Sequence, residues 1–308
     1  MDHQGHGLAL DHEIFNEPHK PAFDWIEVES PKRYDGARSP LHPQGLGETY
    51  QLAQFEIDKP DGWNPTLVSH EGFFTDIPGF ENLAEGNSEK MLGSLSLARQ
   101  GRYFYWGYSI DPERMTEGAR DTLLNVLHYM RSKRDSLTVE FVCKTRKILQ
   151  IYSHLGRDKG YLRGIEEHFP GQLTPKWQET YTPTWEGCAE WLDRYLPYVF
   201  SGKSEQHRGE RYKTIFEVDE DAMALGTPNA ERSSLERWIE LQGSDDALER
   251  ERALRCLYRY VSPEIRPTDG DWASWYETQR DRIVFIESTG FWWQENPVVL
   301  EAEQLEKR

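Results

Sequence analysis

Three histidines near the amino terminus form the densest group of side chains able to bind a metal ion. His3, His6 and His12 lie close together in the sequence, with Asp2 and Asp11 among them. Imidazole nitrogens and carboxylate oxygens are ligands for zinc and other divalent ions. The spacing matches no standard metal motif, and a polar terminal segment is also typical of a solvated chain end. The sequence predicts a metal site at His3, His6 and His12, with a solvated terminus as the alternative.

A run of aromatic residues is the second candidate site. Residues 102–108 read Arg-Tyr-Phe-Tyr-Trp-Gly-Tyr and show no helical period, which favours a strand buried on both faces. Ligands of layered α/β folds bind beyond the carboxyl ends of strands. We therefore expect a small ligand, where one binds, at Tyr105, Trp106 and Tyr108, reached from the loop at 109–115. The alternative is that these rings only fill a core.

Motifs of established enzyme chemistry are missing from the sequence. It holds no Gly-x-Ser-x-Gly, His-Glu-x-x-His or phosphate-loop pattern, so the catalytic residues stay unknown and no cofactor is predicted. Cys143, Cys188 and Cys256 are far apart in the sequence and form no metal-ligand spacing. Each is therefore expected to behave as a small apolar residue. The acidic run at 219–221 lacks the rest of a calcium loop and indicates the start of a helix. Six tryptophans offer either sugar-stacking surfaces or core packing: Trp63, Trp106, Trp272, Trp275, Trp292 and Trp293.

Charge and hydropathy limit the partners. The net charge is −17, from 36 basic and 53 acidic side chains. Such a surface repels phosphate backbones and anionic lipids, so neither nucleic acid nor a membrane is expected, and the partner is an unknown small molecule or protein. No run of 18 apolar residues exists, and the first residues lack the basic start and apolar middle of a signal peptide. We expect a cytoplasmic protein, or a periplasmic or exported one if a signal peptide has been lost.

The pattern of apolar residues predicts an α+β protein, in which a β-rich amino-terminal module packs with a mostly helical carboxyl-terminal half ending in a β-hairpin. Thr116 and Glu117 indicate the start of a helix whose apolar face is Leu123, Val126, Leu127 and Met130. The expected strands of the module are 23–28, 49–57, 66–69, 94–98 and 103–108.

The rest of the chain divides into two further parts. Residues 134–230 have helical periodicity, after a first domain that we place at 1–133. Residues 231–308 begin with a helical hairpin, whose second helix is expected to face inward with Leu248, Leu254, Leu257, Tyr258 and Val261. A short helix at 272–276 and a β-hairpin at 283–293 follow.

One segment resembles a known fold. Residues 10–15, Leu-Asp-His-Glu-Ile-Phe, resemble the DHPIF segment of trehalose-utilisation-type proteins, which have a class I glutamine amidotransferase-like fold. The run Gly-Arg-Tyr-Phe at 101–104 and the helix at 117–130 resemble the strand and helix that close such a domain. The resemblance covers the last half of that domain and departs from it at Glu13, where Pro is usual. It implies a degenerate amidotransferase-like module in 1–133 without the triad, since no Cys, His or Glu matches one.

A broader set of residues is similar to an uncharacterised bacterial family, and residues 231–308 also resemble a HEAT-type hairpin with a Trp-rich cap. This similarity implies architecture and no particular chemistry. The segments that carry it are Gly72–Phe74, Asn87–Lys90, Arg99–Arg102, Trp106-Gly107, Met115-Thr116, Asn125, Phe216–Asp221, Leu225-Gly226, Asn229, Arg259-Tyr260, Asp271-Trp272, Trp275, Asp281-Arg282, Phe285 and Gly290-Phe291.

The functional prediction is a non-catalytic binding or assembly module, because aromatic core and acidic surface are plentiful while no nucleophile or metal set is organised in the sequence. The alternative is a carbohydrate-active enzyme or sugar-binding protein that uses acidic residues or a His-bound metal. A second alternative is a protein-interaction scaffold that uses the HEAT-like hairpin.

Overall fold

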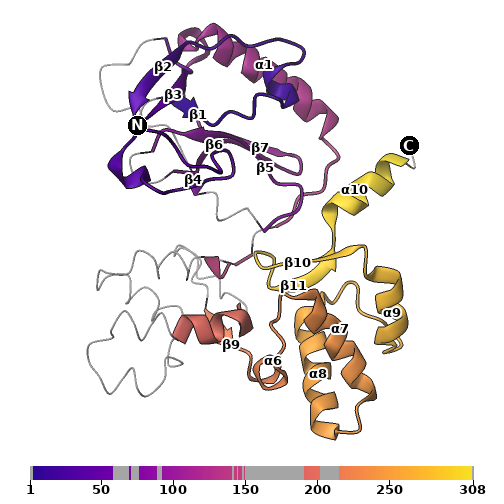
Figure 1. Cartoon of the computed structure of the whole chain (residues 1–308). Coiled ribbons are helices and arrows are strands. Elements are labelled where there is room, and N and C mark those ends of the chain that lie inside the picture. The colour runs from indigo at the N-terminus through magenta and orange to yellow at the C-terminus, as the bar shows by residue number, and fades with distance from the viewer. Residues whose placement is uncertain are drawn as a thin grey trace. The chain divides into compact units, whose positions relative to one another are not determined.

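The computed structural model describes residues 3–57, 69–70, 76–88, 92–140, 142–143, 145–147, 149, 191–201 and 215–306. The chain divides into two compact units, Met1–Val139 and Glu140–Arg308 (Figure 1). Most of the helical region predicted at 134–230 lies outside the described residues, as do Trp63 and Cys188.

An antiparallel sheet forms the centre of the amino-terminal unit. Its order is β2-β3-β1-β5-β6-β4, and β7 also pairs with β6. All pairings between its strands are antiparallel. The strands are β1 Gln4–His6, β2 Trp25–Glu29, β3 Thr49–Gln54, β4 Ser69–His70, β5 Glu81–Gly86, β6 Ser94–Gln100 and β7 Tyr103–Trp106.

The short strand β1 lies in the middle of this sheet. Gly5 is opposite both Ala53 of β3 and Gly86 of β5, so β1 is hydrogen-bonded on both edges. His3 and His6 are both buried. The alternative of a solvated amino terminus is therefore wrong for residues 3–6.

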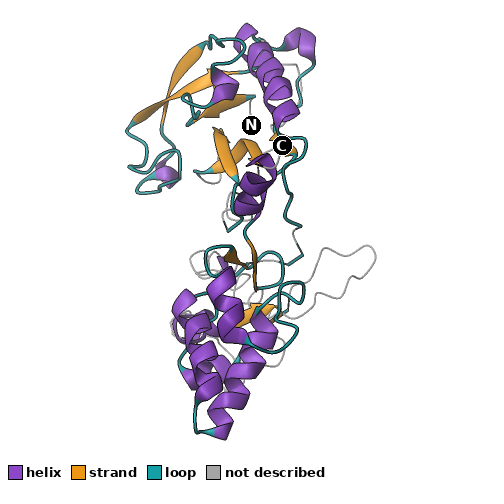
Figure 2. Cartoon of the chain, turned by 90° about the vertical axis from the view of Figure 1, so that its right-hand side faces the viewer, coloured by secondary structure: helices purple, strands orange, loops and turns teal. Residues whose placement is uncertain are grey.

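Helix α1, Glu117–Ser132, covers one face of the sheet (Figure 2). The hydroxyl of Thr116 accepts a hydrogen bond from the Ala119 amide at 3.2 Å, which confirms the predicted cap. Val126 and Tyr129 are buried against the sheet, whereas Leu127 is 61% exposed. The predicted start of the helix is thus correct, and its predicted apolar face is wrong at Leu127.

The other face of the sheet is covered by the segment between β2 and β3. Side chains alternate along a strand, and Ala53 faces α1, so Tyr50 of the same strand faces away from it. The Tyr34 ring packs on Tyr50 with centroids 6.4 Å apart, and His42 packs on His6 with centroids 5.1 Å apart. This second buried layer places polar side chains inside the unit. The short 3-10 helices of the whole amino-terminal unit are η1 Glu13–Phe15, η2 Lys32–Tyr34 and η4 Pro112–Arg114.

The carboxyl-terminal unit is mostly helical and contains the predicted β-hairpin, β10 and β11. The sequence prediction of an α+β fold with these elements is confirmed. A further helix, α10, follows the hairpin and was not predicted. The elements are η5 Leu196–Tyr198, β8 Val199–Ser201, β9 Phe216–Val218, α6 Glu220–Leu225, α7 Arg232–Glu240, η6 Leu241–Gly243, α8 Ala247–Tyr260, α9 Trp272–Gln279, β10 Ile283–Ile286, β11 Trp292–Glu295 and α10 Pro297–Glu306.

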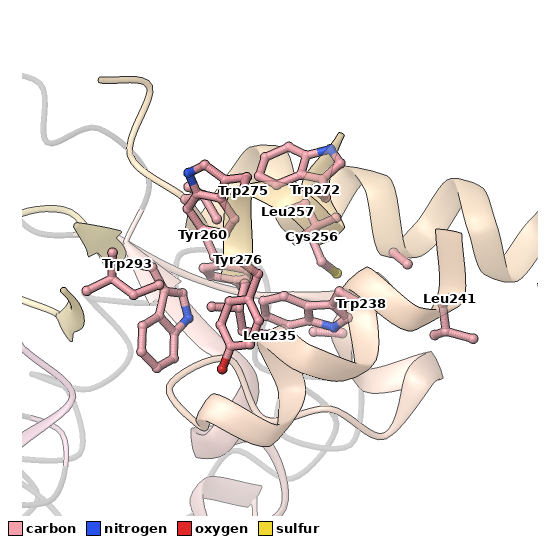
Figure 3. Close-up of a cluster of buried hydrophobic side chains, with 14 residues drawn as sticks. Leu235, Trp238, Leu241, Cys256, Leu257, Tyr260, Trp272, Trp275, Tyr276 and Trp293 are labelled. Atoms are coloured by element: carbon pink, nitrogen blue, oxygen red, sulfur yellow. The ribbon is translucent and has the colours of Figure 1, made fainter. Parts of the chain in front are cut away.

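Tryptophans fill the core of this unit (Figure 3). The Trp238 ring stacks on Tyr260 with centroids 5.3 Å apart, and Trp272, Trp275 and Trp293 are buried beside them. These three predicted sugar-stacking candidates therefore pack in a core. On α8, Leu257 points inward as predicted.

Other predicted inner residues of α8 face solvent. Leu248 is 50% exposed, and Leu254 and Tyr258 are also exposed, so the predicted inner face is wrong at these positions. No helix in the described ranges combines the length and the apolar character needed to cross a membrane.

Candidate metal centre

Two strands bring a histidine and a carboxylate together inside the amino-terminal unit. His6 of β1 is directly opposite Glu85 of β5 in their antiparallel pair. Side chains of such a pair project from the same face of the sheet, with Cβ atoms about 5 Å apart. Both side chains are completely buried.

A third side chain reaches the pair from the segment that covers this face. Residues 39–42 form a turn in which the backbones of Ser39 and His42 pair, and the Ser39 hydroxyl accepts a hydrogen bond from the His42 amide at 3.1 Å. The turn directs the His42 ring toward β1. Gly7, at the end of β1, has φ +53°, and a Cβ there would lie 2.7 Å from Nε2 of His42. A glycine is required here both for its backbone angle and for the space it leaves.

Three donor atoms converge at this point. Nδ1 of His6 lies 2.9 Å from Nε2 of His42, and the two nitrogens lie 3.6 and 3.9 Å from Oε2 of Glu85. Zinc bonds of about 2.0–2.1 Å in a tetrahedron place neighbouring donors about 3.3 Å apart. The observed separations bracket this value, so small side-chain adjustments would bring all three atoms into contact with one ion.

The two imidazoles are neutral near pH 7. Burial, and next the neighbouring His42, lower the pKa of His6 from 6.5 to about 3. Burial also lowers the pKa of His42. A neutral imidazole has a free lone pair on one nitrogen, which is the form that binds metal ions. Burial thus favours the neutral rings that metal ligands need. The hydrogen bond between the two facing nitrogens requires a proton on one of them, which would move to the other nitrogen of that ring when an ion binds.

Aromatic side chains support the cluster. The Tyr50 ring meets His6 edge-on, with centroids 5.4 Å apart, and its hydroxyl donates to Oδ1 of Asn87 at 3.1 Å. The Tyr34 hydroxyl donates to the backbone carbonyl of Ser88. Residues that follow Glu85 are thereby bonded to the layer that packs on His6, and the positions of the donor atoms are fixed by packing.

The structure separates the three histidines predicted as metal ligands. Nε2 of His3 lies 3.8 Å from Glu56, and Nε2 of His12 lies 3.7 Å from Glu81. His12 also caps η1, because its Nδ1 accepts a hydrogen bond from the Ile14 amide. Of the predicted three, only His6 belongs to the cluster with His42 and Glu85.

The three predicted ligand-binding aromatics occupy different environments. Tyr108 is buried, stacks on Phe55 with centroids 4.1 Å apart, and donates to the Ser96 hydroxyl at 2.8 Å. Trp106 packs against the same core. Tyr105 lines a cavity of about 270 Å³ together with Phe80, Leu95, Ala98, Arg99, Gln100, Tyr103 and Phe104. A small-molecule site at these residues stays a prediction, with the cavity at Tyr105 as its most specific location.

The strand that carries these aromatics is not buried on both faces as predicted. Among the described strands β7 pairs with β6 alone, and Tyr103 is 61% exposed. Glu85 of β5 and the aromatic residues of β7 thus belong to the same sheet but have different surroundings, because Glu85 is buried and Tyr103 is exposed.

Comparisons with family models, with curated proteins and with solved structures find no match to this chain.

Proposed function

We propose that the amino-terminal unit is a metal-binding module, in which His6, His42 and Glu85 hold one divalent transition-metal ion, zinc or ferrous iron. The observation that carries this proposal is the convergence of two imidazole nitrogens and a carboxylate oxygen from three separate segments of the chain. Two histidines and one carboxylate are a ligand set used for both ions.

Burial strengthens the case for a bound cation. The side chains of His6 and Glu85 are inaccessible to solvent, and the imidazole of His42 is only 20% exposed. Holding polar side chains in an interior costs free energy unless they are hydrogen-bonded or bound to an ion. His6 and His42 share one hydrogen bond at 2.9 Å, and a metal ion bound by all three side chains would replace it with three bonds to one cation.

This proposal retains the predicted binding module and gives it a ligand class. It also retains the His-bound metal of the alternative, with His42 and Glu85 in place of His3 and His12. A sugar-binding surface has less support, because Trp272, Trp275 and Trp293 pack inside a core. The predicted scaffold role of the helical hairpin stays a prediction.

Zinc binding by the whole chain tests the proposal. After removal of metal with a chelator, equilibrium dialysis should give one zinc ion per chain. His42→Ala should weaken zinc binding by about 100-fold or more, since even the loss of groups that only support a metal ligand costs 10–100-fold. His42 is the preferred substitution because it is partly exposed, so the fold should tolerate the change.

His12→Ala is the matched control. His12 is also a partly buried histidine of the same unit, with 23% of its side chain exposed, and it contacts a different carboxylate. We expect this variant to bind zinc as the unsubstituted chain does. Equal losses in both variants, or no stoichiometric zinc in the unsubstituted chain, would refute the site.

A further inference from the structure

The described cluster offers three ligands to the ion proposed above. Of the described residues, three contribute donor atoms to the cluster, whereas a tetrahedral ion needs four ligands and an octahedral ion six. Structural zinc sites in proteins have four protein ligands, and catalytic sites have three with a water in the remaining position.

Exposure indicates where the remaining position lies. The side chains of His6 and Glu85 have no exposed surface, and the Tyr50 ring closes the site beside His6. The imidazole of His42 is 20% exposed, so the side of the cluster nearest to solvent is the side of the 39–42 turn.

Charge indicates what would bind there. A metal-bound carboxylate is ionised and the two imidazoles are neutral. A divalent ion with Glu85 and two neutral histidines therefore keeps one net positive charge, which favours an anionic ligand at the open position.

Given the metal binding proposed above, on which this inference depends, we infer that the ion keeps an exchangeable coordination position on the His42 side. That position would take water or a small oxygen-donor anion such as a carboxylate or hydroxamate. The centre would then be a Lewis acid that is accessible to small substrates, rather than a closed structural site.

Cobalt substitution of the whole chain tests this inference. Cobalt(II) in a zinc-type site absorbs visible light, and the spectrum depends on the number and type of its ligands. We expect cobalt to bind with one ion per chain, and we expect titration with acetohydroxamate to change the spectrum saturably. His12→Ala should give the same cobalt spectrum and the same response, because His12 lies outside the cluster.

The outcomes separate the two proposals. If cobalt binds stoichiometrically and acetohydroxamate leaves its spectrum unchanged, the open position is refuted while the metal site stands. If cobalt does not bind, or binds equally well to His42→Ala, the metal site itself is refuted. A spectral change lost together with cobalt binding in His42→Ala supports both.

Discussion

At the scale of single residues, Gly7 decides whether His42 can reach the cluster. Gly7 has φ +53°, and a Cβ added there would lie 2.7 Å from Nε2 of His42, so the position has no room for a side chain. In Gly7→Ala the His42 ring must move, and we expect zinc affinity to fall at least tenfold. Competition with a coloured chelator would measure this change.

Gly36→Ala is the control for backbone strain. Gly36 has φ +70° and lies in the same covering segment as His42, and a Cβ there would meet no atom within 4 Å. Both variants place alanine in the left-handed region, which destabilises the chain by about 1 kcal/mol. Equal zinc affinities in the two variants would show that the contact with His42 is irrelevant.

The residues of the candidate centre were only partly predictable. His6 was selected as one of three clustered histidines, but His42 is a single histidine between Pro40 and Pro43 without any spacing signal. Glu85 had a weak signal, as a carboxylate that directly follows the apolar pair Leu83 and Ala84. The three residues meet through strand pairing and a covering segment, and sequence spacing does not report on such contacts.

At the scale of elements, the two aspartates that cap α6 and α8 differ in burial. Asp219 and Asp246 each accept two backbone hydrogen bonds at a helix start. The buried Asp219 also accepts from the Tyr260 hydroxyl at 2.7 Å and pairs with Arg259. We expect Asp246→Ala to cost about 1 kcal/mol of unfolding free energy and Asp219→Ala roughly 3 kcal/mol. Urea denaturation of both variants would test this difference, and similar losses would contradict it.

The contact between α6 and α8 should depend on pH. The hydrogen bond from Arg255 holds the pKa of Asp221 below its ordinary value of 3.8. Since the folded-state pKa is the lower one, this stabilisation is present above 3.8 and is lost as the pH falls through the folded pKa. The unfolding free energies of Arg255→Gln and the unsubstituted chain should differ at neutral pH and converge as the pH falls below 3.8.

Denaturation at a series of pH values would measure this convergence. Arg237→Gln is the control, because Arg237 pairs with Glu240 on an open helix surface where both side chains are more than half exposed. Such pairs contribute little to stability, so the control should follow the unsubstituted chain. A pH-independent difference for Arg255→Gln would contradict the proposed cause.

The elements that sequence predicted well have strong local signals. The start of α1 follows from Thr116, and the acidic run at 219–221 begins α6 with Asp219 as its cap. The strands β1 and β5 were missed because β1 has three residues and β5 begins with Glu-Asn, which favour no strand. These two missed strands carry His6 and Glu85, so nothing in the sequence indicated that the two side chains lie opposite each other.

At the scale of the whole molecule, metal binding should stabilise one unit and leave the other unchanged. The three ligands belong to the unit Met1–Val139. Zinc at a hundredfold excess over its dissociation constant should add about 2.7 kcal/mol to the stability of that unit. Hydrogen exchange followed by mass spectrometry should show slower exchange in β1, β5 and residues 39–42. Equal protection of α7 and α8 would contradict a site confined to the first unit.

The central place of β1 has a consequence for the order in which the chain assembles. Its three residues come before those of both partners in the chain, since β3 ends at Gln54 and β5 ends at Gly86. The pairs β2–β3 and β5–β6 join near neighbours in sequence, so they can form early, whereas β1 must wait for both and then insert between them. Until it does, the edges of β3 and β5 stay open to other chains, and such edges promote aggregation. The strand β1 is thus among the last elements of the sheet to pair, and His6 reaches Glu85 only when it does.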